Sequence, residues 1–260
     1  MKKNIITILK IGGKIISDRQ KCAAALESFA ALREQKILVH GGGAGLNDRL
    51  LRMGIEPRMV NGRRITDDKT LEAALMVYAG LENKKIVAAL QAVRCPAVGL
   101  SGADGDMIRA EKRAVGETDY GWAGDIKRVN SGNLIKLLQA GFVPVFCALT
   151  HDGRGQMLNT NADTIAAALA AALSVSYRTR LVYAFEKNGV LRDPAKENTI
   201  IKEIDPAMYR RLKKEKVVGD GMLPKLDNAF WALRKGAAEV RIVHYDRITN
   251  RNEGTRVIWP

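Results

Sequence analysis

The glycine-rich stretch Val39-His40-Gly41-Gly42-Gly43-Ala44-Gly45 decides how this chain folds. The apolar run at residues 36–39 predicts a buried strand, and residues 46–53 predict a helix directly after the glycines. Glycines between a strand and a helix leave backbone N–H groups accessible at a helix N-terminus, where the helix dipole favours negative charge. This turn is therefore predicted to bind phosphate.

A second glycine turn lies upstream. Residues 5–11 predict a strand that carries Lys10 near its end and is followed by Gly12-Gly13. Because ligands of open α/β sheets bind at the carboxyl ends of the strands, the two turns and the lysine predict one phosphate site. Glycine pairs after strands often serve only as turns. Three consecutive glycines followed by Gly45 exceed what a turn requires.

Composition places the chain among ordinary globular proteins. It has 260 residues, of which 47% are hydrophobic and 27% are charged. No apolar run is long enough for a membrane span, and no signal peptide is expected at the N-terminus. The three cysteines, Cys22, Cys95 and Cys147, fit no disulfide framework or metal spacing, so we expect a cytoplasmic protein.

The net charge of +14 raises the question of nucleic-acid binding. The basic residues are dispersed along the chain and mostly stand beside acidic ones. The densest run, residues 209–216, alternates like a solvated helix face. We therefore expect the charge to attract small anionic substrates, and we expect neither a nucleic acid nor a membrane as a partner.

Strand and helix patterns alternate along the whole chain, which predicts a mostly parallel sheet with helices on both faces. Exceptions to this alternation are a hairpin at residues 58–65 with Asn61-Gly62 at its turn, a long helix from Asp67 to about residue 93, and a β-ribbon at residues 107–129. Expected strands lie at residues 5–11, 36–40, 97–100, 143–147, 179–185, 239–244 and 255–259.

The common nucleotide-binding motifs are absent. No G-x-x-x-x-G-K-[ST] occurs, and Leu46 breaks the G-x-G-x-x-G pattern, which argues against a dinucleotide-dependent oxidoreductase. The three histidines, His40, His151 and His244, are isolated in sequence, so no metal site is predicted.

Four short motifs occur in a specific order: Lys-x-Gly-Gly at 10–13, His-Gly-Gly-Gly at 40–43, Asn-Gly-x-Arg-x-Thr-Asp at 61–67 and Asn-x-Asn-Ala-Asp at 159–163. Together they make the chain resemble the amino-acid kinase family over essentially its whole length. Within that family, the members that phosphorylate N-acetylglutamate are the most similar.

The resemblance implies one kinase domain over residues 1–260, folded as an open three-layer αβα sandwich with a mainly parallel central sheet. Residues 1–158 would form the acyl-amino-acid lobe and residues 159–260 the ATP lobe of a homodimer. The implied reaction is ATP-dependent phosphorylation of the γ-carboxylate of N-acetyl-L-glutamate, which gives N-acetylglutamyl 5-phosphate in arginine biosynthesis. Mg²⁺ is expected to be carried on ATP rather than in a protein cage.

The resemblance also implies roles for individual residues. Lys10 and Lys225 match the lysines that stabilise the transferring phosphoryl group, and Asp163 matches the aspartate that positions them. The remaining matches are phosphate-binding Gly12, Gly13 and Gly41, substrate-binding Gly42, Gly43, Arg64 and Asn159, and nucleotide-binding Glu186 and Gly221.

This chemistry fits the residue types. Phosphoryl transfer needs positioning and neutralisation of spreading negative charge, which two lysines and a set of backbone N–H groups supply. The nucleophile is a carboxylate with a pKa of about 4.3, so it is already ionised at neutral pH and needs no catalytic base. Arg64 suits a carboxylate because its guanidinium binds two oxygens at once.

Simpler interpretations exist for several of these residues. Lys10 and Lys225 could reach solvent, Asn159 and Asp163 could be helix caps, and either Arg64 or its neighbour Arg63 could be a surface residue.

Two departures from the family leave alternatives open. Phe185-Glu186 stands where many members have a hydroxyl residue and an aspartate, which leaves a non-catalytic nucleotide-binding member as an alternative. The region 101–129 is unusually basic, with Arg109, Lys112, Arg113, Lys127 and Arg128, so N-succinyl-L-glutamate is an alternative substrate. The short segment before the first strand predicts a dimer that arginine does not inhibit.

Overall fold

A computed structural model describes residues 3–193, 195–219 and 221–260, and within these ranges the centre of the molecule is an eight-stranded sheet. All neighbouring strands of this sheet are parallel except β13 and β14. The predicted mainly parallel sheet is thus confirmed. Across the sheet the strands are β12 (Glu203–Ile204), β14 (Thr255–Val257), β13 (Glu239–His244), β11 (Arg178–Phe185), β1 (Ile5–Ile11), β2 (Gln35–His40), β8 (Val143–Phe146) and β5 (Ala97–Leu100).

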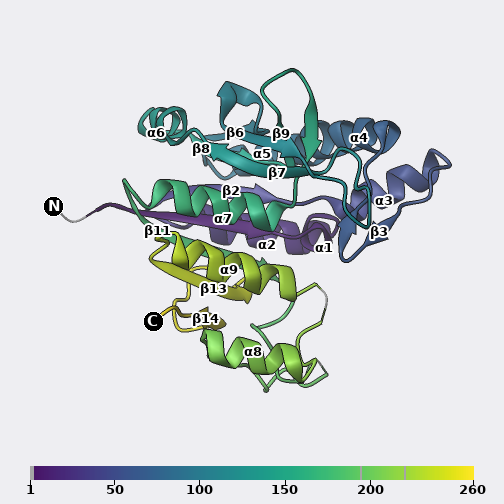
Figure 1. The fold of residues 1–260 in the computed structure, drawn as a ribbon. Helices are drawn as coiled ribbons and strands as arrows, with labels where there is room; N and C mark the ends of the chain where they lie inside the picture. The colour runs from purple at the N-terminus through teal and green to yellow at the C-terminus, as the bar shows by residue number, and fades with distance from the viewer. Residues whose placement is uncertain (1–2, 194, 220) are drawn as a thin grey trace.

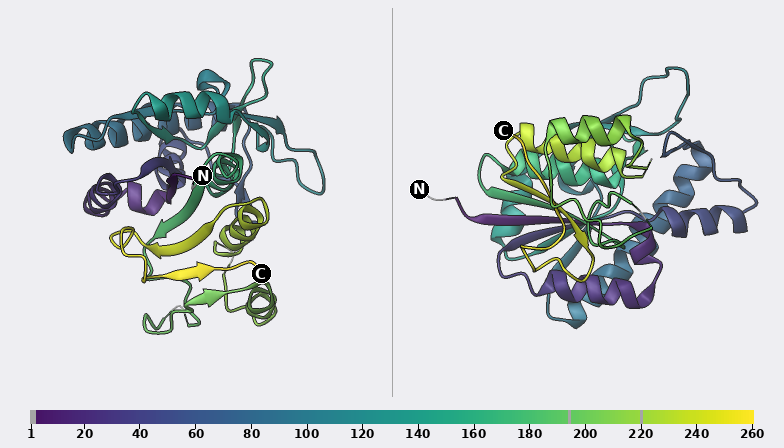
Figure 2. Two further views of the ribbon diagram at one scale, coloured as in Figure 1. Left: turned by 90° about the vertical axis from the view of Figure 1, so that its left-hand side faces the viewer. Right: turned by 90° about the horizontal axis from the view of Figure 1, so that it is seen from below.

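Helices cover both faces of this sheet, as Figures 1 and 2 show. Helices α2 (Arg19–Ala30) and α5 (Asn83–Ala92) pack on one face, and α7 (Ala162–Leu173) and α9 (Leu223–Arg234) pack on the other. Successive strand residues point to opposite faces, so β1 buries Leu9 on the α2 side and Ile8 on the α7 side. The same alternation carries Lys10 to the α7 side. The three-layer αβα sandwich is confirmed.

Two smaller sheets lie beside the main one. Their strands are β10 (Met157–Asn159), β9 (Leu149–His151), β6 (Ile108–Lys112) and β7 (Gly124–Val129) in one, and β3 (Met59–Val60) and β4 (Arg63–Arg64) in the other. The pairing of β6 with β7 confirms the predicted ribbon. The β3–β4 hairpin turns at Asn61 and Gly62, which have φ angles of 50° and 72°, as the Asn-Gly pair predicts.

The helix after the second glycine turn begins three residues earlier than predicted. Helix α3 spans Gly43–Arg52, with Gly42 as its N-cap residue. Gly45 lies in its first turn, where a Cβ would come 3.3 Å from the Glu82 carboxylate. A short helix, α1 (Gly13–Ile16), which the sequence pattern did not predict, follows the first glycine turn. Further helices are η2 (Asp104–Asp106), α6 (Ser131–Gln139) and α8 (Pro206–Lys214).

The predicted long helix from Asp67 is present but is not a regular α-helix. It consists of α4 (Asp68–Ala74), the π-helical segment η1 (Leu75–Glu82) and α5. Asp67 caps it by accepting a hydrogen bond from the Thr70 N–H at 2.9 Å. The π-helical segment was not predicted, since its apolar pattern alone resembles that of an α-helix.

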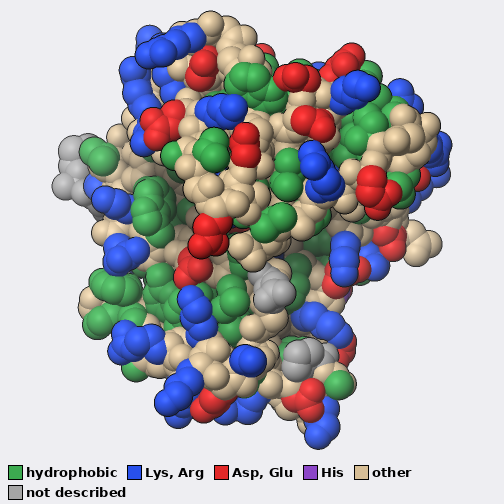
Figure 3. Space-filling view, turned by 45° about the vertical axis from the view of Figure 1, so that its right-hand side comes forward, with side chains coloured by type: hydrophobic (Ala, Val, Ile, Leu, Met, Phe, Trp, Pro, Cys, Tyr) green, Lys and Arg blue, Asp and Glu red, His purple; other side chains and the backbone are tan. Residues whose placement is uncertain are grey.

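Charged side chains of both signs are interspersed on the surface. On the face shown in Figure 3, acidic side chains stand among the more numerous lysines and arginines. Of the helices formed by the described residues, none is long and apolar enough to cross a membrane.

Candidate active site

The two glycine turns meet at the carboxyl ends of neighbouring strands β1 and β2. Ile11 and His40, the last residues of these strands, are paired, and the Gly41 N–H donates to the Ile11 carbonyl at 3.1 Å. A Cβ on Gly13 would lie 3.1 Å from the Gly43 nitrogen, which is tighter than nearly all Cβ contacts, so glycine suits this close approach. The two turns therefore lie side by side at one edge of the sheet, as the sequence predicted. Their binding of phosphate stays a prediction.

A buried carboxylate between two lysines lies next to this surface. The Nζ atom of Lys10 on β1 is 2.7 Å from Asp163 Oδ1, and the Nζ atom of Lys225 in the first turn of α9 is 2.8 Å from Asp163 Oδ2. The exposed fractions of the Lys10, Lys225 and Asp163 side chains are 8%, 17% and 6%. Three charged residues that are distant in sequence thus form one cluster, and neither lysine simply points into solvent.

Asn161, and not Asp163, caps helix α7. The Asn161 side chain accepts hydrogen bonds from the N–H groups of Asp163 at 2.8 Å and Thr164 at 3.2 Å. The interpretation of Asp163 as a helix cap is therefore wrong. The carboxylate of Asp163 is left to pair with the lysines.

Burial and charge act in opposite directions within this cluster. Burial raises the pKa of Asp163, but Lys10 and Lys225 outweigh it and hold that pKa below the ordinary value of 3.8. Burial lowers the pKa of Lys10 from 10.5, and the attraction of Asp163 only partly compensates. The carboxylate therefore keeps its charge, and it also supports the charge of Lys10.

A pocket of about 230 Å³ opens beside the glycines, and Arg64 on β4 lines it. Arg64 is buried, and its Nη2 donates to the side chain of Asn47 and, at 3.4 Å, to the Gly43 carbonyl. Its Nη1 is buried without a hydrogen-bond partner among the described residues. A buried cationic donor without an acceptor fits an anionic ligand group. Arg63 is exposed, so of the two arginines Arg64 is the buried one and Arg63 the surface residue.

Other residues of this pocket were partly predicted. Asn159 lines it and donates to Thr66 Oγ1 at 3.0 Å, so it holds β10 to the segment after β4 and does not cap α7. Tyr78 and Thr160 also line it but were missed. Tyr78 reaches the pocket from the π-helical segment, which no sequence signal revealed.

The predicted nucleotide-binding residues are separated from this pocket. Glu186 follows β11 and pairs with Lys21 of α2, at 2.6 Å. Neither Glu186 nor Gly221 is among the described residues that line a hollow of about 120 Å³ beside them. That hollow is lined by Phe185, Lys187, Gly189, Val190, Leu191, Val217, Val218, Gly219 and Met222. The nucleotide roles of Glu186 and Gly221 remain predictions.

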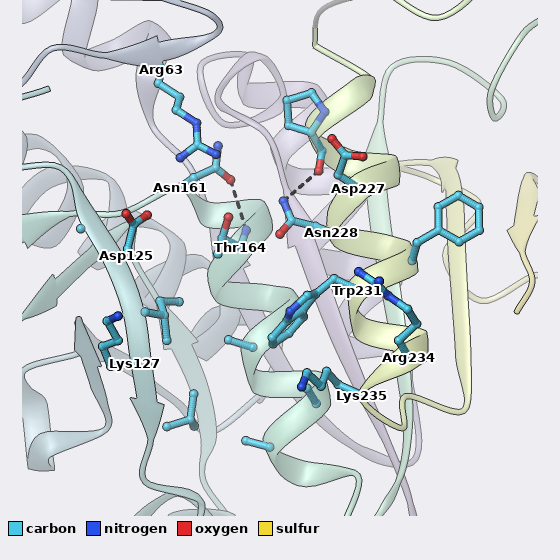
Figure 4. Close-up of a pocket in the computed structure, with 18 of the residues that line it drawn as sticks. Arg63, Asp125, Lys127, Asn161, Thr164, Asp227, Asn228, Trp231, Arg234 and Lys235 are labelled. Atoms are coloured by element: carbon cyan, nitrogen blue, oxygen red, sulfur yellow. Dashed lines mark hydrogen bonds between the residues drawn. The ribbon is translucent and has the colours of Figure 1, made fainter. Parts of the chain in front are cut away.

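A larger groove of about 1060 Å³ adjoins the pocket between β7, α7 and α9. Figure 4 shows Trp231 of α9 lying across it, with Arg63 and Lys127 at one side and Arg234 and Lys235 at the other. The groove and the pocket share four lining residues: Arg63, Arg113, Gly124 and Asn161. Two arginines, Arg63 of β4 and Arg113 just after β6, therefore border both spaces.

Within the ranges that the structure covers, no group of three His, Cys, Asp or Glu side chains is arranged to hold a metal ion. The one carboxylate in the glycine pocket, Asp163, is already paired with the two lysines. His40 is fully buried beside the glycine turn.

Comparison with known proteins gives consistent results. The profile described as the amino acid kinase family matches residues 6–244. The chain is 48% identical over 252 residues to the acetylglutamate kinase of Bacteroides thetaiotaomicron, covering 97% of this chain and 98% of that one. It is 41% identical over 243 residues to the acetylglutamate kinase of Methanopyrus kandleri, covering 92% and 95% of the two chains. Among solved structures, the smu.665 protein of Streptococcus mutans has a TM-score of 0.82 at 23% identity, covering 97% of this chain and 98% of that one.

Proposed function

The chain belongs to the amino acid kinase family, and we propose that it transfers the γ-phosphoryl group of ATP to the γ-carboxylate of N-acetyl-L-glutamate. The product would be N-acetylglutamyl 5-phosphate, an intermediate of arginine biosynthesis. Relatives named acetylglutamate kinase that are up to 48% identical over nearly the whole chain support this substrate.

The observation that carries the proposal is the Lys10–Asp163–Lys225 cluster beside two glycine turns. In the proposed step, a carboxylate oxygen of the substrate forms a bond to the γ-phosphorus while the bond to the ADP oxygen breaks. Negative charge then spreads over the phosphoryl oxygens, where two ammonium groups and backbone N–H groups stabilise it. No proton has to leave the nucleophile.

The remaining parts of the site are proposed from the family resemblance. Residues 1–158 would hold the acylated amino acid, with Arg64 on its α-carboxylate, and residues 159–260 would hold ATP. The main sheet joins these two halves where β1 pairs with β11. Mg²⁺ would be bound by the phosphates of ATP as part of the substrate, since Asp163 is occupied by the lysines. A cytoplasmic location accords with this role.

A second substrate, N-succinyl-L-glutamate, is favoured by one specific observation. Besides Arg64, the arginines Arg63 and Arg113 line the glycine pocket. The extra carboxylate of a succinyl group could pair with either of them, whereas an acetyl group has no charge to pair.

The test is a hydroxylamine trap of the acyl phosphate, with ATP–Mg and each acylglutamate in turn. Hydroxamate from the acetyl compound supports the proposal, and hydroxamate mainly from the succinyl compound keeps the mechanism but changes the substrate. ATP binding without hydroxamate from either compound would leave a non-catalytic nucleotide-binding protein.

Substitution of the lysines tests the mechanism directly. Lys10→Ala and Lys225→Ala should each lower kcat by about a hundredfold or more, while Lys136→Ala, on the exposed face of α6, should leave it unchanged. Near-normal turnover of either active-site variant would contradict the role of that lysine.

A further inference from the structure

The buried side chains of His40 and Asn83 form a hydrogen-bonded pair behind the glycine turn. His40 ends β2, Asn83 begins α5, and their exposed fractions are 0% and 1%. The His40 Nε2 atom lies 3.0 Å from Asn83 Nδ2, and the His40 Nδ1 atom lies 2.7 Å from the Gly41 carbonyl oxygen. Neither residue lines the pocket.

The surroundings of Asn83 determine which atoms donate. Asn83 Nδ2 also donates to the Val145 carbonyl at 2.9 Å, and the Asn83 oxygen faces the Lys84 ammonium at 3.4 Å. A carbonyl only accepts and an ammonium only donates, so the amide orientation is fixed. His40 Nε2 must then accept, and its proton resides on Nδ1, which donates to Gly41. Burial keeps the imidazole neutral by lowering its pKa to about 4.

The hydrogen bond from His40 to the Gly41 carbonyl also determines the direction of the next N–H group, that of Gly42. In a trans peptide the C=O and the following N–H point in opposite directions. Because His40 holds the Gly41 carbonyl towards itself, the Gly42 N–H points away from His40. Gly42 lines the pocket, and among the described residues its N–H meets no acceptor. The first N–H groups of α3 beside it also lack acceptors within their helix.

The π-helical segment brings a second constraint to the same peptide. The Asn83 N–H donates to the Tyr78 carbonyl, five residues earlier, which stacks the two residues along one side of the helix. In a regular α-helix, residues five apart differ by about 140° in direction. Tyr78 packs on Gly42 so closely that a Cβ there would lie 2.5 Å from its ring. One irregular turn thus places Asn83 on His40 and Tyr78 on Gly42.

We propose that His40 and Asn83 are positioning residues, which orient the Gly41–Gly42 peptide so that the Gly42 N–H points at the transferring phosphoryl group. The inference rests on the proposed kinase function. Donors that are oriented before the reaction stabilise developing charge without reorganising. The pair contacts no substrate and acts through the peptide that it holds.

Two matched substitutions separate this role from a purely structural one. Asparagine places its amide nitrogen where histidine has Nδ1, whereas glutamine places it where histidine has Nε2. His40→Gln should therefore lose at least about tenfold in kcat, with both KM values within about threefold of wild type. His40→Asn should restore most of kcat, and Asn83→Leu should resemble His40→Gln. His151→Gln, on the β6–β9 sheet, is the control and should change kcat less than twofold, about the scatter of such measurements.

The melting temperature of each variant is measured alongside. If His40→Asn and His40→Gln lose activity equally, in step with their melting temperatures, the pair serves folding only and the proposal is wrong.

A second readout does not depend on turnover. Long-range ¹H–¹⁵N NMR of the imidazole should show His40 as the neutral Nδ1–H tautomer at neutral pH. The Nε2–H tautomer or an imidazolium would overturn the proposal, whichever substrate the protein uses. Failure of the hydroxylamine trap with this tautomer present would contradict the kinase function instead.

Discussion

Arg64 and Arg63 are neighbours in sequence but differ in environment, and this difference leads to a prediction at the scale of single residues. Arg64 is buried and its Nη1 has no hydrogen-bond partner among the described residues, whereas Arg63 is exposed on the same hairpin. Arg64→Lys keeps the charge but removes the planar pair of donors. We expect KM for the acylglutamate to rise by about tenfold or more, with KM for ATP unchanged.

Arg63→Lys is the matched control for this measurement. It should change KM for N-acetylglutamate much less, since that arginine is exposed. If the two substitutions change this KM equally in steady-state kinetics, the proposal that Arg64 binds the α-carboxylate is wrong.

Asp163→Asn leads to a prediction about pH. Burial, and to a lesser extent the nearby charge of Lys225, lower the pKa of Lys10, and Asp163 counters both. Without this carboxylate the pKa of Lys10 should fall further, so the lysine loses its proton at a lower pH. The kcat of the variant relative to wild type should therefore decrease as the pH rises. A constant ratio across a pH–rate profile would show that Asp163 does not support the charge of Lys10.

The same carboxylate affects stability in the acid range. Because its folded pKa lies below 3.8, Asp163 contributes stability above pH 3.8, which is lost as the pH falls through the folded value. Acid unfolding of wild type should converge with that of Asp163→Asn below this range.

At the scale of elements, the glycine turn and the π-helical segment are fitted to each other. A Cβ on Gly42 would overlap the Tyr78 ring at 2.5 Å. Gly42→Ala should therefore lower the free energy of unfolding by about 1–3 kcal/mol, as overpacking does. It should also lower kcat, because the Gly41–Gly42 peptide has to move. Chemical denaturation and the hydroxamate assay measure the two effects.

Gly132→Ala serves as the control. Gly132 lies in α6, where the nearest atom to a new Cβ, Asn130 Oδ1, is at an ordinary contact distance of 3.6 Å. Alanine should stabilise that helix by up to about 1 kcal/mol. If Gly42→Ala proves equally harmless, the packing of Tyr78 on the turn does not constrain it.

At the scale of the whole molecule, we expect a homodimer formed by the outer edge of the main sheet. Strand β5 ends the sheet, and among the described residues no strand pairs with its outer edge. Helix α5 packs on β5, and Met76 and Leu81 in the preceding η1 segment are 42% and 49% exposed. An unpaired sheet edge and exposed apolar side chains on the helix that leads to it are each typical of an interface.

Sedimentation velocity tests this expectation. The wild-type chain should sediment as a dimer, and Leu81→Asp should shift it towards a monomer. Val175→Asp, at an exposed apolar residue after α7, should leave the dimer intact. A wild-type monomer or hexamer, or dissociation by the control substitution alone, would contradict the proposed interface.

By itself, the sequence determined the features that short segments encode. The alternation of strands and helices, the helix start at Asp67 and the Asn61-Gly62 turn all depend on neighbouring residues, and the structure confirms them. The two glycine turns were found in the same way. Their meeting followed from one general rule, that parallel strands end at the same edge of a sheet.

Only the tertiary structure decided which side chains complete the site. The family resemblance already implied that Asp163 positions both lysines. The lack of a partner for Arg64 Nη1 among the described residues and the burial of His40 on Asn83 depend on contacts between distant segments. The π-helical turn also left no trace in the apolar periodicity. The hydrophobic periodicity of a segment indicates which face of that helix or strand is apolar. Which polar side chains meet is determined by how several helices and strands pack together.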